Sequence, residues 1–210
     1  DLELFDAIRI DHFRGIHDFW SVPAGAPNAR EGQWFDGPGL AFTGALAGLP
    51  LVAEDLGLLS PGVDVLRQAS GLPGMSVLQF GFGGPPEGNP HFPTNITADR
   101  IVYTGTHDND TVVGWYAQAS AEEHARVEAV FGTMNAPHIA LSEAALASPG
   151  IAAFIPVQDL LGLGAEARFN TPGNPQGNWA WRMSDLQLTT LAATAGAWKQ
   201  RLKATHRLNA

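Results

Sequence analysis

The sequence lacks cysteine and has few basic side chains, and both shortages exclude classes of function. Without cysteine, the 210-residue chain can form no disulfide, thiolate nucleophile or thiolate metal site. Its 12 lysines and arginines against 21 aspartates and glutamates give a formal net charge of -9. This negative charge argues against nucleic acid or an anionic membrane as a partner. An uncharged ligand, in contrast, needs no basic surface to bind.

Several motifs of enzyme families are also absent. The sequence contains no Gly-x-Ser-x-Gly of a serine esterase, and residues 81–84 lack the lysine and helix start of a phosphate-binding loop. It contains no His-Glu-x-x-His or other spaced set of metal ligands. The side chains that could still bind a metal are His12, His17, His107, Asp108 and Asp110. A catalytic metal is the weaker alternative, and we expect neither a metal nor a cofactor.

Long apolar runs are missing too. The first four residues, Asp-Leu-Glu-Leu, lack the basic start and the apolar stretch of a signal peptide. The longest uncharged run, residues 68–86, is broken by Pro73 and several glycines, so it is a poor candidate to cross a bilayer. We expect a soluble, cytoplasmic protein that binds no membrane, unless a segment upstream of residue 1 carries a signal.

What is present is typical of an α/β protein. Hydrophobic residues make up 45% of the chain, and its length suggests one or two globular domains. Apolar runs of strand length alternate with helix-like stretches and loops, which predicts parallel strands. These runs lie at about residues 6–11, 50–54, 75–82, 100–105 and 151–157.

Capping signals predict several helices. Ser60 precedes Pro61 as an N-cap precedes the first helical position, and Ser120 and Glu123 form a capping-box pattern for a helix that Gly132 ends. Shorter and longer helices are predicted at 142–146 and 184–206. In the second of these, the expected inward residues are Leu186, Leu188, Leu191, Trp198 and Leu202. The loops 81–94 and 170–178 could equally bind a ligand or merely connect elements.

Three apolar runs are each followed by a carboxylate, at Asp11, Glu54 and Asp108. Arg9 lies two residues before Asp11, so on a strand both side chains share a face, and the guanidinium favours an ionised nucleophile. The apolar residues before Glu54 should raise its pKa, as a general acid requires. The structural alternatives are an Arg–Asp pair that ties strands together and a turn residue that follows a strand.

The segment 105–111 is rich in polar side chains, and His107 with Asp108 could hydrogen-bond neighbouring hydroxyls of one sugar. Two carboxylates in contrasting environments match the cleavage of a glycosidic bond, in which one attacks the anomeric carbon and one protonates the leaving oxygen. The sequence thus predicts a carboxylate site for a neutral, hydroxyl-rich substrate.

Six segments together resemble the 4-α-glucanotransferases (amylomaltases or disproportionating enzymes), family seventy-seven of the glycoside hydrolases in the α-amylase clan. They occur in the family's order over nearly the whole chain. The segments are residues 9–15, 53–57, 73–80, 105–111, 158–164 and 178–182. Phe169 replaces a methionine of the family pattern, which is a minor departure.

This resemblance implies Asp11 as nucleophile, Glu54 as acid/base and Asp108 as transition-state stabiliser. It implies Arg9 and His107 as supports of the donor-side sugar. The implied reaction is retaining: a covalent glycosyl-enzyme forms and is intercepted by a hydroxyl of an α-1,4-glucan acceptor such as maltodextrin or starch.

The resemblance also places Asp55 and Phe80 toward the acceptor sugar. It implies a (β/α)8 TIM barrel, of which residues 1–210 would be the C-terminal part, covering about the last five strands. The first three strands and the family's inserted subdomains would lie upstream of residue 1, so we expect the chain to need that N-terminal portion. The alternatives are a hydrolase of the same clan and a noncatalytic glycan-binding fragment.

Overall fold

All five predicted strands are present in the computed structural model, which describes residues 2–57 and 60–208. The chain divides into two compact units, Asp1–Met75 and Ser76–Ala210. The five strands are β1 (Ile8–Ile10), β4 (Leu51–Ala53), β5 (Gly74–Val77), β6 (Arg100–Tyr103) and β7 (Ala152–Phe154).

In the first unit, β1 and β4 pair in parallel, with Ile10 opposite Ala53. Three helices accompany this pair: α1 (Arg14–His17), α2 (Gly39–Ala45) and α3 (Pro61–Ala69). A small core of buried side chains from α1, α3 and the strand pair joins them. Its buried members are Phe13, Ile16, Ala53, Val63 and Leu66. The core fixes the strand pair whose ends carry the first two predicted acids.

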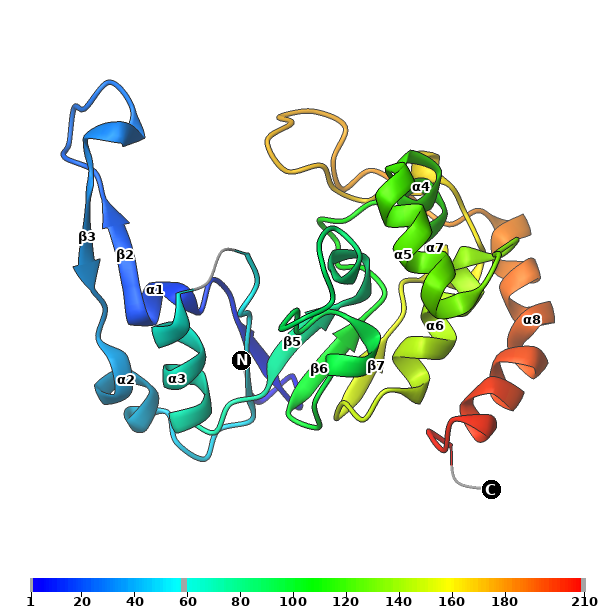
Figure 1. The fold of residues 1–210 in the computed structure, drawn as a ribbon, viewed down its shortest axis with the longest axis horizontal. Coiled ribbons are helices and arrows are strands. Elements are labelled where there is room, and N and C mark those ends of the chain that lie inside the picture. The colour runs from blue at the N-terminus through cyan, green and yellow to red at the C-terminus, as the bar shows by residue number, and fades with distance from the viewer. Residues whose placement is uncertain (1, 58–59, 209–210) are drawn as a thin grey trace. The chain divides into compact units, whose positions relative to one another are not determined.

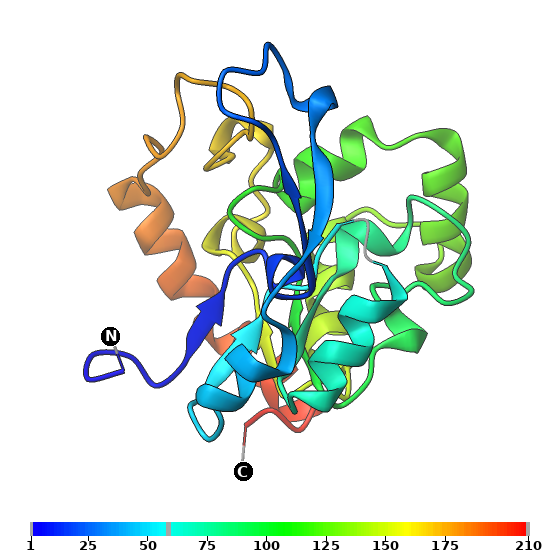
Figure 2. The same ribbon diagram turned by 90° about the vertical axis from the view of Figure 1, so that its left-hand side faces the viewer.

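The first unit also contains an antiparallel hairpin that was not predicted, formed by β2 (Asp18–Ser21) and β3 (Gln33–Asp36), with a 3-10 turn η1 (Ala29–Glu31) between them (Figures 1 and 2). Phe19 stacks on Phe35 and Trp20 meets Trp34 edge to face. Successive residues of a strand point to opposite faces, so both faces of the hairpin carry an aromatic pair. Such adjacent aromatics give no alternating pattern, which is why the sequence did not signal the strands.

The second unit contains β6, β7 and the second half of β5, which form the sheet β5-β6-β7; β6 and β7 run parallel with Tyr103 opposite Phe154 (Figure 1). The helices of this unit are α4 (Val112–Gln118), α5 (Ala121–Phe131), α6 (Pro137–Ala147), α7 (Val157–Leu160) and α8 (Asp185–Ala204). Its 3-10 turns are η2 (Leu78–Gly81), η3 (Pro93–Asn95) and η4 (Ala165–Ala167). Its core packs one face of α6 against β6 and α4, through Leu78, Ile96, Val102, Val112, Leu141 and Ala145.

The predicted strand at 75–82 is wrong in its second half, because β5 ends at Val77 and η2 follows. The amide of Val77 donates to Nδ1 of His91, a side chain of the following loop, at 3.2 Å. Asn89 of the same loop donates to the carbonyls of Phe80 and Gly81. These loop contacts take the hydrogen bonds that a longer strand would give to a neighbour.

The helix starts predicted from capping signals are confirmed. Ser60 takes the N-cap position of α3, although its hydroxyl makes no capping hydrogen bond. Ser120 with Glu123 forms a complete capping box at α5, and the helix is followed by Gly132 with φ 73°. The helix predicted at 142–146 is longer and begins at Pro137.

The predicted helix at 184–206 is α8, but two of its expected inward residues are wrong. Leu186 and Leu188 are 76% and 54% exposed, whereas Trp198 is buried. The later turns of α8, from Leu191 on, line an apolar hollow together with Leu146 and Ile155. Leu186 and Leu188 lie in the first turn, outside this hollow. Among the described residues, no helix is both long enough and apolar enough to cross a membrane.

Candidate active site

Asp11 directly follows β1, and its carboxylate is 80% exposed. Arg9 donates from Nη2 to Asp11 Oδ1 at 2.8 Å, which confirms that the two side chains lie on the same side of the strand end. The next residue, His12, has φ 48°, a left-handed conformation that few residues other than glycine adopt. The strand end therefore presents an accessible carboxylate that is anchored by a guanidinium.

Glu54 follows β4, the strand paired with β1. Its Oε2 accepts from the His12 amide at 2.7 Å and its Oε1 from the Leu56 amide at 3.0 Å. Burial raises the pKa of Glu54, and the two backbone hydrogen bonds oppose this shift only in part. The raised pKa confirms the sequence prediction.

The pairing of β1 with β4 brings Asp11 and Glu54 to neighbouring strand ends. Ile10 and Ala53 are partners in the register, and each acid is the next residue along its strand. The Glu54 amide donates to the Ile10 carbonyl at 2.9 Å, which continues the ladder to the acid itself. One acid is exposed beside an arginine and the other is partly desolvated, so the two differ in the way that acid and nucleophile roles require.

Asp55 is buried and faces away from this strand end. Its Oδ1 accepts from the Met75 amide at 2.7 Å, and its Oδ2 lies 3.3 Å from Nε of the buried Arg67. Arg67 also donates to the Leu72 carbonyl. This placement favours a structural role that joins β4, α3 and the start of β5, and sugar binding by Asp55 stays a prediction.

The second unit carries the third acid, in the irregular segment between β6 and α4. Asp108 Oδ1 accepts from Asn170 Nδ2, and the Asp108 carbonyl accepts from Arg168 Nη2 at 2.8 Å. His107 Nε2 lies 3.4 Å from Asp108 Oδ2. The segment is braced internally, because Asn109 Oδ1 accepts from both the amide and the hydroxyl of Thr106. Sequence reasoning assigned no role to Arg168 or Asn170, although both lie in or beside a suspected binding loop.

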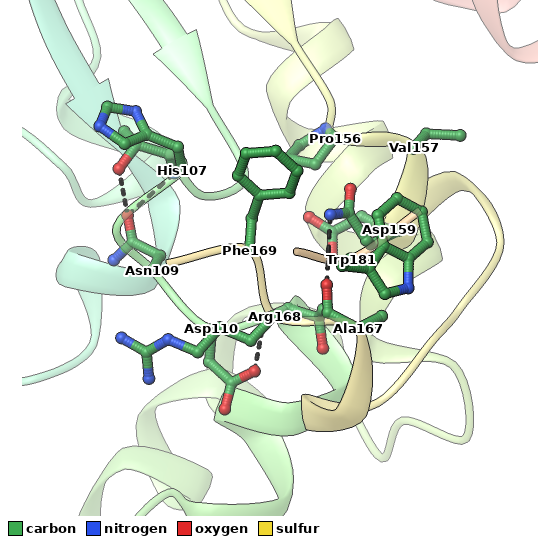
Figure 3. Close-up of a pocket in the computed structure, with 13 residues that line it drawn as sticks. His107, Asn109, Asp110, Pro156, Val157, Asp159, Ala167, Arg168, Phe169 and Trp181 are labelled. Carbon is green, nitrogen blue, oxygen red and sulfur yellow. Dashed lines mark hydrogen bonds between the residues drawn. The ribbon is translucent and has the colours of Figure 1, made fainter. Parts of the chain in front are cut away.

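A pocket of about 280 Å³ lies beside this segment (Figure 3). Phe169 projects into it, with His107 and Asn109 on one side and Asp159 and Trp181 on the other. The remaining lining residues are Thr106, Asp110, Thr111, Pro156, Val157, Gln158, Ala167 and Arg168. The pocket therefore joins the predicted His107 to the 158–182 region.

A second hollow of about 510 Å³ brings Phe80 and Asp108 together, with Gln79, Trp115 and Arg168 in its wall. Phe80 is 42% exposed and meets His91 edge to face at 5.6 Å. Burial lowers the pKa of His91 to about 4. Within residues 2–57 and 60–208, the His, Asp and Glu side chains form no group of three or more that could hold a metal ion.

The architecture is that of a mixed α/β protein with acids placed directly after parallel strands. Comparison with known proteins shows that the chain belongs to the 4-alpha-glucanotransferase family of glycoside hydrolases, whose model matches residues 1–189. The 4-alpha-glucanotransferase of Synechocystis is 44% identical over 90% of this chain and 39% of its own length. That of Thermus thermophilus is 45% identical over 90% of this chain and 40% of its own length.

Among solved structures, the amylomaltase from Streptococcus agalactiae in complex with acarbose matches with a TM-score of 0.90 and 31% identity. The match covers 99% of this chain and 43% of the amylomaltase chain. The chain thus spans about two fifths of the length of these relatives.

Proposed function

We propose that the polypeptide containing this chain is a 4-α-glucanotransferase that moves α-1,4-glucan segments between maltodextrin or starch chains. The observation that carries the proposal is the pair Asp11 and Glu54 at adjacent strand ends, one exposed beside Arg9 and one with a raised pKa. Family membership and the acarbose complex of the Streptococcus agalactiae amylomaltase support an α-glucan substrate.

In the proposed reaction, Asp11 attacks the anomeric carbon while Glu54 protonates the leaving glycosidic oxygen. Glu54 then takes the proton of an acceptor hydroxyl, which attacks the glycosyl-enzyme and restores the original configuration. The raised pKa of Glu54 extends toward higher pH the range in which it can hold the proton that the first step needs. The roles of Asp108, Arg9, His107 and Phe80 are proposed as the family resemblance implies.

We further propose that β1, β4, β5, β6 and β7 are five of the eight strands of a (β/α)8 barrel. Five strands do not close such a barrel, so we expect activity to require the part of the family's fold that this chain does not cover. A cytoplasmic location stays a prediction, and the names of the rice, Arabidopsis and potato relatives place those proteins in plastids.

The test is to incubate these 210 residues, and in parallel the longest natural polypeptide that contains them, with maltotriose and to resolve the products by chromatography. A transferase yields glucose together with maltopentaose and longer chains, whereas a hydrolase yields only glucose and maltose. Products from the longer polypeptide alone would show that the remaining fold is needed. The absence of transfer from both folded samples would contradict the proposal.

A further inference from the structure

Asp159 is a buried acid that the proposed reaction does not use. It lies in α7, and its side chain is 1% exposed. Its Oδ2 accepts from the Thr104 hydroxyl at 2.6 Å and its Oδ1 from the Val112 amide at 2.8 Å. Thr104 is the first residue after β6, and Val112 is the first residue of α4. One carboxylate therefore binds both ends of the segment that carries His107 and Asp108.

Both hydrogen bonds are buried, which makes them costly to lose. Thr104 and Val112 are fully buried. If the carboxylate were removed, the Thr104 hydroxyl and the Val112 amide would each lose this hydrogen-bond acceptor at a buried position. Asp159 is itself fixed, because its amide donates to the Pro156 carbonyl at the start of α7. The carboxylate thus acts from a rigid turn on a segment that has no regular structure.

The neighbouring residue, Gln158, contacts the chain segment whose Arg168 binds Asp108. Its Nε2 donates to the Ala167 carbonyl at 3.3 Å. Ala167 immediately precedes Arg168, whose guanidinium donates to the Asp108 carbonyl. Asp159 therefore binds the segment that contains Asp108, and Gln158 binds the segment 167–170 that contacts Asp108.

We propose that Asp159 is a positioning residue for Asp108 and His107, and that it acts by fixing the two ends of the segment 104–112. This inference rests on the proposed transferase function, in which Asp108 stabilises the transition state. A displacement of about 1 Å at such a group can lower the rate about 100-fold. Because Asp159 lies outside the proposed contacts with sugar, its loss should lower kcat more than it raises KM.

The test uses Asp159→Ala and Thr104→Val in the longest natural polypeptide that contains these residues. We expect kcat for maltotriose transfer to fall about 100-fold in Asp159→Ala and about 10-fold in Thr104→Val, with a smaller rise in KM through the displaced His107. Val127→Ala is the matched control, since it removes buried atoms of α5 in the same unit and should lower stability while kcat is kept. All rates are compared at a temperature where circular dichroism shows each variant folded.

A second readout needs no activity. Hydrogen exchange of the amides of residues 104–112 should become at least about 10-fold faster in both variants, while that of α5 stays protected. Unchanged exchange in this segment, or an unchanged kcat in folded Asp159→Ala, would overturn the positioning role; if that variant does not fold, Thr104→Val decides by the same measurements. If the wild-type polypeptide shows no transfer but its variants show faster exchange, the proposed function fails and the fixing of the segment stands.

Discussion

The acids of the two units are held in different ways. Asp11 and Glu54 are held by groups at the ends of the paired strands β1 and β4, namely Arg9 and the amides of His12 and Leu56. Asp108 is held by Arg168 and Asn170, which lie 60 and 62 residues further along the chain. The register of one strand pair therefore fixes the chemical environment of the first two acids, whereas long-range side-chain contacts fix the orientation of the third.

The largest effect that this comparison predicts is that of Asp11→Asn. The amide cannot form the glycosyl-enzyme, so transfer should fall by more than about 10⁴-fold, and mass spectrometry should detect no trapped adduct. Asp36→Asn is the control, because Asp36 is an exposed acid of the same unit in β3. An adduct on the Asp11→Asn variant would remove Asp11 from the nucleophile role.

Glu54→Gln should lower transfer from maltotriose by about 10²- to 10⁴-fold, the usual contribution of a general acid. A donor with a good leaving group needs no protonation, so the glycosylation step should be largely restored with α-glucosyl fluoride. In the wild type, glycosylation should decline as the pH rises through the raised pKa of Glu54, because the acid then loses its proton. Normal turnover of maltotriose by the variant would contradict the acid/base assignment.

The same comparison explains how much of the site the sequence could predict. Acids that follow apolar runs are visible in the sequence, and a strand end places the next residue in space, as it does for Asp11 and Glu54. Asp108 was visible in the same way, but it lies in the irregular segment after β6, where the strand end does not fix it. The capping box Ser120–Glu123 likewise predicted α5, and Ser60 before Pro61 predicted the start of α3, each from a few neighbouring residues. Contacts over 60 residues, such as Asn170 with Asp108, have no local signal and were missed.

Sequence patterns gave wrong predictions where the packing partners of a segment decide its structure. Leu188 has the helical spacing of a buried face with Leu191, whereas Leu186 lies two residues before Leu188 and cannot share that face. Only the later turns of α8 find a packing partner. The apolar run after Val77 is typical of a strand, but His91 takes the hydrogen bond that would extend it. The periodicity of a segment indicates which of its residues could be buried. It does not indicate which other segment will pack against them.

His91 gives a prediction for stability in the second unit. Its folded pKa of about 4 lies below the ordinary value of 6.5, so the unfolded chain binds a proton between these values that the folded chain does not. The contribution to stability is present above pH 6.5 and is lost as the pH falls toward 4, by up to about 3 kcal/mol. Urea unfolding at several pH values should show this decline in the wild type and a smaller one in His91→Gln. An identical pH dependence in both would contradict the assignment to His91.

The smallest effect should come from Asn170→Ala. The substitution removes one hydrogen bond to Asp108 Oδ1 but keeps the hydrogen bond from Arg168 to the Asp108 carbonyl. The backbone of Asp108 therefore stays fixed, while its carboxylate is less well oriented. We expect kcat to fall about 10-fold, which corresponds to about 1.4 kcal/mol, the range of a single hydrogen bond to a charged group. Gln176→Ala is the control, because it alters an exposed side chain of the same loop. A loss as large as that of Glu54→Gln would contradict the expectation that Arg168 keeps Asp108 in place. An unchanged kcat would mean that Asn170 does not orient Asp108, and the contrast between the two units would have to be abandoned.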